Sequence, residues 1–194
     1  MTGGVSLSKG QTVSLDKTAG GSLSRIRMGL GWDAAEKKGL FGRKKQDIDL
    51  DASALLFNDQ GQLVDQVWFA QLTSKDGSVQ HTGDNRTGAG EGDDESIRVD
   101  LSKVPAEVTT LVFTVNSFTG QDFTQIRNAV CRLVDETHAD REIARYELSG
   151  SGSHNAQIMA KVARDGAGWS MTAIGVPASG RTFRELLPAI AGHL

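Results

Sequence analysis

The chain has 194 residues with a formal net charge of −3, and its 38% hydrophobic and 23% charged residues are ordinary for a globular protein. The length predicts a single domain over residues 1–194, and the charge argues against nucleic acid as a partner. The single cysteine, Cys131, excludes an intramolecular disulfide. We find neither a secretory signal nor an apolar run of about 18 residues that could span a bilayer, so we expect a cytoplasmic protein.

The N-terminal part of the chain alternates between apolar and polar residues, which is the pattern of β-strands. Residues 5–15 predict a hairpin or two short edge strands. Residues 25–32 predict a strand, one face of which carries Ile26, Met28, Leu30 and Trp32. Gly29 and Gly31 fall on the other face, where we expect a neighbouring backbone or loop to approach closely.

Residues 36–45 (EKKGLFGRKK) contain glycine breaks and no strand alternation, so we expect a loop. Its basic residues are Lys37, Lys38, Arg43, Lys44 and Lys45. A basic loop with Leu40 and Phe41 at its centre can dock on an acidic partner or on anionic lipid, as a peripheral contact at the inner membrane face. A solvated surface loop is the simpler interpretation.

The remainder of the chain also indicates short strands separated by turn signals. We expect these strands at residues 47–57, 63–72, 97–101, 110–118, 129–135, 142–148, 156–163 and 169–176. A helix is predicted over residues 182–191, where helical spacing relates Phe183, Leu186, Leu187 and Ile190. The pattern predicts an all-β fold, an antiparallel β-sandwich with a short C-terminal helix.

The most unusual segment is the acidic, glycine-rich run GDNRTGAGEGDDE at residues 83–95. It holds five carboxylates and one base, so an ordered loop needs a cation or the solvation of every charge. Its glycines let the backbone turn carbonyls inward, and carboxylates with carbonyls form the oxygen set that calcium prefers. A solvated, mobile loop is the alternative. An EF-hand is excluded, because Arg86, Gly88 and Ala89 break its pattern and strands flank the run.

A second acidic cluster lies on the strand at 47–57, where Asp47, Asp49 and Asp51 share one face. Like charges on one face are costly unless they are solvated or bound to metal. We expect Asp49 or Asp51 beside the acidic run if both lie at the same end of the sandwich. Asp33 and Asp76 are further candidates.

Four segments resemble the TerD family of tellurium-resistance and stress-response proteins: GLGWD (29–33), DLDAS (49–53), DGSVQHTGDNRTGAGEGDDESIRVDL (76–101) and IARYELS (143–149). WFAQL (68–72) and FTVNSFTGQ (113–121) are closer to its TerZ-type branch. The resemblance implies an antiparallel β-sandwich that binds calcium, with two ions expected. It implies ligands at Asp49, Asp51, Asp84, Asn85, Asp93, Asp94 and Glu95, and further ligands at Thr87, Gly88 and Glu91. The implied partners are other stress-response proteins of the same system.

Catalytic motifs are missing from the sequence, so we expect no enzymatic activity and no catalytic residue. The segment around His154 lacks a G-x-S-x-G context, and the glycine-rich segments match neither a P-loop nor a dinucleotide fingerprint. Cys131 alternates with apolar neighbours and is predicted to be buried and inert; a reactive thiol that reduces tellurite is the alternative. His81 adjoins the acidic run, and we expect it to form a hydrogen bond rather than to bind metal.

Overall fold

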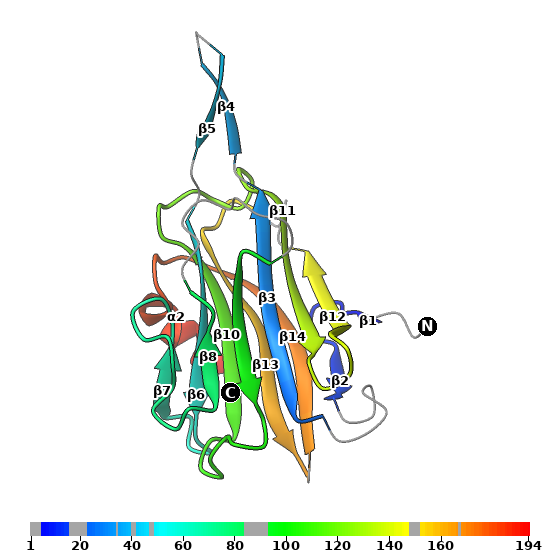
Figure 1. The fold of residues 1–194 in the computed structure, drawn as a ribbon. Coiled ribbons are helices and arrows are strands. Elements are labelled where there is room, and N and C mark those ends of the chain that lie inside the picture. The colour runs from blue at the N-terminus through cyan, green and yellow to red at the C-terminus, as the bar shows by residue number, and fades with distance from the viewer. Residues whose placement is uncertain are drawn as a thin grey trace.

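The computed structural model describes residues 5–15, 23–33, 35–39, 42–46, 49–83, 93–147, 152–166 and 168–194. Two six-stranded sheets pack face to face (Figure 1). The first sheet has the strand order β1 (Val5–Ser6), β12 (Arg141–Glu147), β11 (Arg127–Asp135), β3 (Arg25–Asp33), β9 (Glu95–Asp100), β8 (Val79–His81). The second has the order β2 (Thr12–Ser14), β14 (Gly168–Ala178), β13 (Ala156–Asp165), β10 (Thr110–Ser117), β6 (Leu50–Phe57), β7 (Leu63–Val67).

The strand pairs of the two sheets are antiparallel except for β1 and β12, which pair in parallel within the described residues. The predicted all-β sandwich is therefore confirmed. β1 and β2 lie at the edges of different sheets, so residues 5–15 form two short edge strands rather than a hairpin.

The main core lies between the inner faces of the two sheets. The predicted apolar face of β3 is buried, with Ile26, Met28, Leu30 and Trp32 each at most 3% exposed. The same cluster contains Leu111, Phe113 and Val115 from β10 of the second sheet. The period-two pattern therefore assigned the inward face of β3 correctly.

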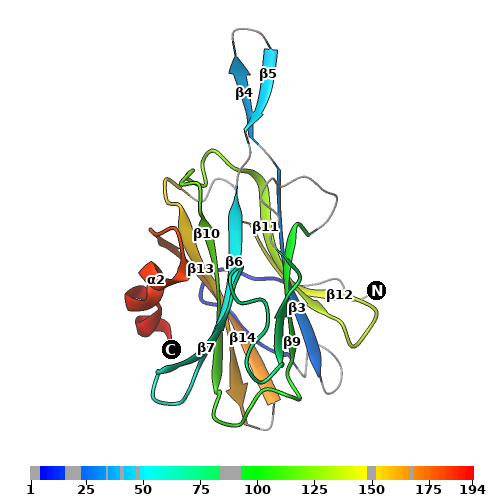
Figure 2. The same cartoon turned by 60° about the vertical axis from the view of Figure 1, so that its left-hand side comes forward.

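A second apolar cluster lies on the outer face of the second sheet, where α2 (Phe183–Ile190) covers it (Figure 2). The helix buries Phe183, Leu186 and Ile190 at the predicted spacing. The carboxylate of Glu185 accepts a hydrogen bond of 3.0 Å from the backbone N–H of Thr182, which satisfies one of the free donors at the start of the helix. A short 3-10 turn, η1 (Ala191–His193), follows.

The prediction of a loop over residues 36–45 is wrong. β4 (Ala35–Gly39) and β5 (Gly42–Gln46) pair as a two-stranded hairpin that projects from one end of the sandwich (Figures 1 and 2). Alternation reveals a strand only when one of its faces is apolar. The two strands hold Lys, Arg, Glu, Gln and Gly with Ala35 as their one apolar residue, so neither has an apolar face and the sequence gives no period-two signal.

The strand predicted over residues 63–72 is shorter in the structure, because β7 ends at Val67. Trp68 and Gln71 exchange backbone hydrogen bonds of 3.0 and 2.9 Å, and this pairing reverses the chain. The short strand β8 was not predicted; its three residues are too few for alternation to be recognised.

Candidate metal centre

Asp49 and Asp51 lie at the start of β6 on the outer face of the second sheet. Their neighbours Leu50 and Ala52 belong to the core between the sheets, so alternation directs the two carboxylates to the opposite face. The two residues are only 8% and 4% exposed. Burying two carboxylates on one face is costly unless hydrogen bonds or a cation compensate for the lost water.

The neighbouring strand β10 continues this polar face. The register pairs Asp51 with Asn116 and Ser53 with Thr114. All four residues are at most 4% exposed. Directly paired side chains of an antiparallel sheet lie close together, so the start of β6 and the end of β10 form one row of buried oxygen-bearing groups.

Glu95 extends from the start of β9 toward the second sheet. Its Oε2 accepts a hydrogen bond of 2.9 Å from the backbone N–H of Ala52, the residue that follows Asp51. The side chain of Glu95 is fully buried. The end of the acidic run is thus joined to the Asp49–Asp51 strand, as expected.

The two residues before Glu95, Asp93 and Asp94, contact groups of the first sheet instead. Asp94 Oδ2 accepts a hydrogen bond of 2.9 Å from the backbone N–H of Trp32. Asp93 lies on the outer face of the first sheet, where its carboxylate pairs with Arg27 and with Arg132 Nε at 2.7 Å. An ion-paired carboxylate must leave both arginines before it can bind a cation, so Asp93 is placed less favourably than Asp49 or Asp51 for metal binding.

Gly29 allows this position of Asp93. A Cβ atom on Gly29 would lie 2.2 Å from Asp93 Oδ2, inside any permitted contact. The expectation that a loop approaches the glycine face of this strand is confirmed. Asp93 is therefore an anchor that fixes the end of the acidic run on β3.

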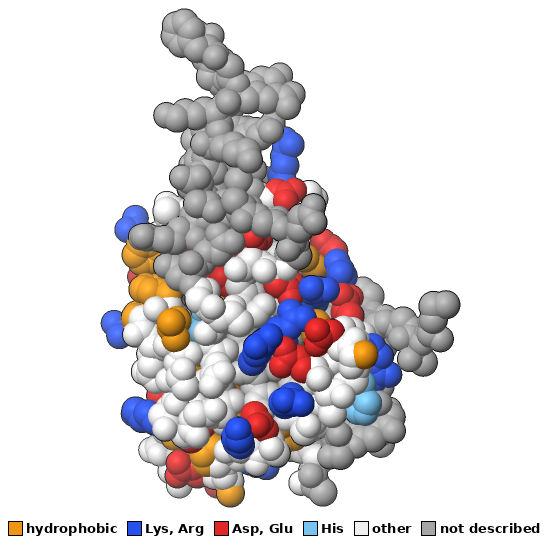
Figure 3. Space-filling model, in the orientation of Figure 1, with side chains coloured by type: hydrophobic (Ala, Val, Ile, Leu, Met, Phe, Trp, Pro, Cys, Tyr) orange, Lys and Arg blue, Asp and Glu red, His pale blue; other side chains and the backbone are white. Residues whose placement is uncertain are grey.

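The arginines around Asp93 belong to a larger network of charges on the outer face of the first sheet (Figure 3). Glu136 Oε1 accepts from Arg98 at 2.9 Å and lies 3.2 Å from Arg27 Nε. The hydrogen bond that Arg132 donates to Asp93 raises the pKa of the Arg132 guanidinium. Because positive and negative charges alternate in this network, its partners neutralise one another.

His81 contacts the acidic run from β8. Its Nδ1 accepts a hydrogen bond of 3.1 Å from the backbone N–H of Gly83, which leaves the ring proton on Nε2. Nε2 lies 3.3 Å from Glu95 Oε2. The predicted hydrogen-bonding role of His81 is confirmed by its contact with Gly83.

Several predicted ligands lie outside the described residues: Asp84, Asn85, Thr87, Gly88 and Glu91. Asp47 also lies outside them. Of the further candidates, Asp33 accepts from Asn128 Nδ2 at 2.5 Å, and Asp76 accepts from Ser78 N at 2.6 Å within a turn. The described residues contain no group of three or more His, Cys, Asp and Glu side chains arranged to hold a metal ion.

The groups at the start of β6 nevertheless fit a hard cation. Asp49 and Asp51 offer carboxylate oxygens, and Asn116 Oδ1 is a buried oxygen that accepts no hydrogen bond within the described structure. Calcium takes six to eight oxygen ligands in loose geometry, so these residues would supply part of its coordination. Asn116 was missed in the sequence. Its signal is an amide side chain at an outward position of a central strand.

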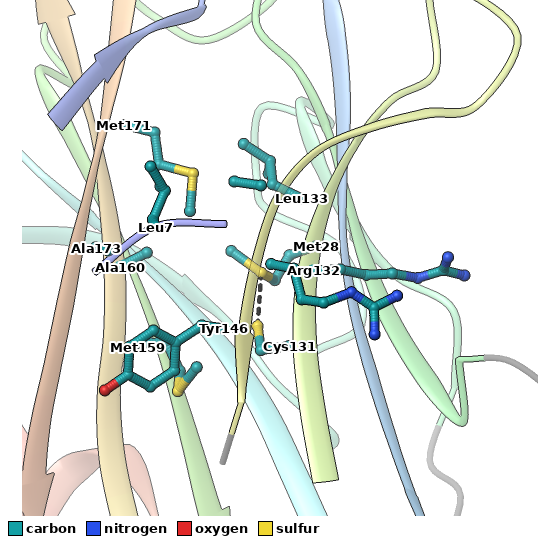
Figure 4. Close-up of a pocket in the computed structure, with 12 residues that line it drawn as sticks. Leu7, Met28, Cys131, Arg132, Leu133, Tyr146, Met159, Ala160, Met171 and Ala173 are labelled. Carbon is teal, nitrogen blue, oxygen red and sulfur yellow. Dashed lines mark hydrogen bonds between the residues drawn. The ribbon is translucent and has the colours of Figure 1, made fainter. Parts of the chain in front are cut away.

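Cys131 faces the core rather than this site. It lines a cavity of about 10 Å³ together with Met28, Met159 and Met171, and its Sγ lies 2.9 Å from Met28 Sδ (Figure 4). Burial, with a smaller contribution from Asp93, raises the pKa of the Cys131 thiol to about 12. A cavity of this size holds about one water molecule, so an oxyanion has no room beside the thiol.

The fold and the site define a class: a β-sandwich in which Glu95, at the end of the acidic run on the first sheet, contacts the second sheet through the backbone N–H of Ala52. The chain belongs to the TerD family, since the TerD domain matches residues 3–188. The resemblance noted in the sequence is confirmed. No helix among the described residues is long and apolar enough to cross a membrane.

Individual relatives agree with this assignment. The chain is 47% identical to tellurium resistance protein TerZ of Serratia marcescens, with 94% of each chain covered. It is 40% identical to stress response protein SCP2 of Bacillus subtilis (strain 168), over 88% of this chain and 91% of the relative. A crystal structure of a Streptomyces coelicolor A3(2) homologue of telluride resistance protein (TerD) shares the fold, with a TM-score of 0.73, 18% identity and coverage of 88% and 98%.

Proposed function

We propose that this TerD-family protein is a calcium-binding, non-enzymatic stress-response protein of the tellurium-resistance type. Calcium is held by oxygen ligands at the end of the sandwich where β6 begins. Asp49 and Asp51 are the central ligands, and the acidic run supplies the others.

One observation carries the proposal: the carboxylates of Asp49, directly before β6, and Asp51, within it, are both more than nine-tenths buried. Their mutual repulsion adds to the cost of burial, and a divalent cation offsets both. The nearby groups are oxygens, whereas Cys131 lies in the core and His81 is directed at Glu95. This donor set favours calcium over softer metals.

The hydrogen bond between Glu95 and Ala52 supports the proposal that the acidic run contributes ligands to the calcium site. It brings the end of that run beside the residue that follows Asp51. We expect two ions per chain, with ligands drawn from Asp84, Asn85, Thr87, Gly88, Glu91, Asp94 and Glu95. Asp93 acts in this arrangement as the anchor to Arg27 and Arg132.

Thermal unfolding of the full chain in calcium and in EDTA tests the proposal. A ligand that binds only the folded state stabilises it by about 2.7 kcal/mol at a concentration of 100 Kd, so calcium raises the melting temperature and EDTA reverses the rise. Asp51→Asn greatly reduces this shift. Asp59→Asn, at an exposed turn beyond the far end of β6, is the matched control and keeps the full shift. Equal melting curves of the wild type in millimolar calcium and in EDTA would refute the proposal.

The absence of catalysis is supported by the state of the reactive side chains. The Cys131 thiol is buried with a raised pKa, and the paired His81 and Glu95 side chains are fully buried, away from any substrate. The names of the relatives denote resistance and stress response. We propose that the protein acts through other stress-response proteins of the same system.

A second candidate function is docking on an anionic surface through the projecting β4–β5 hairpin. Its register pairs Lys37 with Lys44 and Lys38 with Arg43. Like charges at directly paired positions destabilise a hairpin, and an anionic partner relieves this repulsion. Five basic residues contribute roughly 1 kcal/mol each on an anionic membrane, which suits reversible binding.

Vesicle sedimentation tests this second candidate. Replacement of Lys37, Lys38, Arg43, Lys44 and Lys45 by Gln abolishes binding to vesicles that contain phosphatidylserine, and calcium affinity is retained. The matched control replaces five exposed basic residues of the sandwich, Lys9, Lys75, Lys103, Arg181 and Arg184. Equal losses in both variants would show that only general charge matters, and this result would reject the hairpin as the docking element.

A further inference from the structure

The side-chain amide of Asn116 is fully buried at the end of β10. Its Nδ2 donates a hydrogen bond of 3.1 Å to the backbone carbonyl of Gly180. A carbonyl can only accept, so the NH₂ group must be the side of the amide that faces Gly180. This contact fixes the orientation of the amide and directs Oδ1 away from Gly180. Oδ1 is buried and accepts no hydrogen bond within the described residues.

Asn116 lies directly opposite Asp51 in the register of β6 and β10, on the same outer face of the second sheet. An ionised carboxylate offers only acceptors, and so does Asn116 Oδ1. Two buried acceptors at directly paired positions repel each other unless a donor or a cation lies between them. The Thr114–Ser53 pair, two residues further along, has hydroxyl groups that can donate as well as accept.

We propose that Asn116 Oδ1 is a neutral ligand of the cation held by Asp51, and that Asn116 thereby connects this cation to the segment that precedes α2. The inference rests on the proposed calcium binding. It adds a ligand on a second strand, and it predicts that binding of the ion stabilises the segment that precedes α2.

The connection runs through both backbone groups of Gly180. Its carbonyl accepts from Asn116 Nδ2, and its N–H donates to Asn155 Oδ1 at 3.1 Å. The next residues, Arg181 and Thr182, both donate their backbone N–H groups to the Glu185 carboxylate in the first turn of α2. A cation that holds Asn116 in place therefore also holds Gly180, three residues before α2 begins at Phe183.

Calorimetric calcium titrations of two Asn116 variants separate the ligand from a merely structural side chain. Asn116→Leu keeps the size of the side chain and removes the oxygen, so calcium affinity falls by at least about tenfold. Asn116→Asp keeps an oxygen and adds charge, so it binds calcium more tightly than Asn116→Leu. Asn155→Ala, which removes the other partner of Gly180, keeps the wild-type affinity.

Hydrogen exchange of the α2 amides measures the effect of calcium binding on this helix. Calcium slows exchange of the α2 amides in the wild type. Asn116→Asp still binds calcium but can no longer donate to Gly180 O, so calcium no longer slows exchange at α2 in this variant. Melting curves in EDTA confirm that each variant is folded.

Each result bears on a different part of the inference. A wild type that binds calcium together with an Asn116→Leu variant of unchanged affinity would overturn the ligand role, while the proposed function would stand. Equal affinity losses in Asn116→Leu and Asn116→Asp would assign the residue a structural role only. Calcium binding without any change of exchange at α2 in the wild type would overturn the connection. A wild type that binds no calcium would refute both proposals.

Discussion

The carboxylate of Glu95 and the backbone N–H of Ala52 form a hydrogen bond of 2.9 Å that joins the two sheets of the sandwich. β7 pairs with β6 only from Ala54 onward, so the N–H of Ala52 lies beyond the end of its neighbouring strand. Glu95 occupies that position with a fully buried side chain, and His81 lies 3.3 Å from the same oxygen. Glu95, a residue of the acidic run, thus helps to hold the two sheets of the sandwich together.

Removal of this contact lowers the free energy of unfolding even when no calcium is present. Glu95→Ala leaves the N–H of Ala52 without its acceptor, and an unsatisfied buried donor costs about 1–3 kcal/mol. Urea unfolding in EDTA measures the loss. Glu107→Ala, at an exposed position, is the control and changes stability little. Wild-type stability of Glu95→Ala in EDTA would contradict this structural role.

A methyl group on Gly29 displaces Asp93 from its arginines. The new Cβ would lie 2.2 Å from Asp93 Oδ2, and such overpacking costs about 1–3 kcal/mol. We expect Gly29→Ala to unfold at lower urea concentration than the wild type. Gly192→Ala is the matched control, because no atom lies within 4 Å of its added Cβ. Equal midpoints for the two variants would show that Asp93 does not depend on Gly29.

The buried carboxylate of Asp65 predicts a dependence of stability on pH. Burial by itself raises the pKa of Asp65, but hydrogen bonds from Lys75 N, Gln71 Nε2 and Gln66 N outweigh it and lower the pKa below 3.8. A carboxyl with a lowered folded-state pKa stabilises the fold above its unfolded pKa and loses this effect as the pH falls through the folded value. The stability difference between wild type and Asp65→Asn is therefore largest above about pH 4 and shrinks below it. Urea midpoints from pH 7 to pH 2 measure it, and a constant difference would contradict the assignment.

The Cys131 thiol is expected to be unreactive in the folded protein. Its pKa of about 12 leaves almost no thiolate at pH 8, and the side chain is buried. A thiol reagent at pH 8 should label the wild type only after unfolding in urea. Cells that carry Cys131→Ala should keep full tellurite resistance. Fast labelling of the folded chain or loss of resistance would favour a thiol-dependent reduction of tellurite instead.

Alternation predicted most of the fold because the two sheets share an apolar interior. Ile26 to Trp32 on β3 and Leu111 to Val115 on β10 have apolar side chains at every second position, and these side chains form the core. The β4–β5 hairpin was not predicted, since a basic ribbon outside the core has no apolar face. β8 was too short to recognise, and β7 ends early because Trp68 and Gln71 close a turn.

The candidate site was predictable only in part. The sequence indicated Asp49 and Asp51, whose position on one face follows from alternation. It could not separate the positions of the consecutive residues Asp93, Asp94 and Glu95. Asp93 lies on the outer face of the first sheet, Asp94 accepts from the backbone N–H of Trp32, and Glu95 lies between the sheets. These positions depend on long-range partners such as Arg132. Asn116 was missed because its relation to Asp51 comes from strand register, which single-strand patterns do not contain.

Calorimetric calcium titrations of two proteins test the central claim most directly. The first protein is the wild type, and the second is the double variant Asp49→Asn/Asp51→Asn. With two or more carboxylates per ion, we expect a Kd on the order of micromolar for at least one site of the wild type. The double variant should lose that site and, in EDTA, remain folded. An absence of binding heat in the wild type at millimolar calcium, or an unchanged titration of the double variant, would contradict the account.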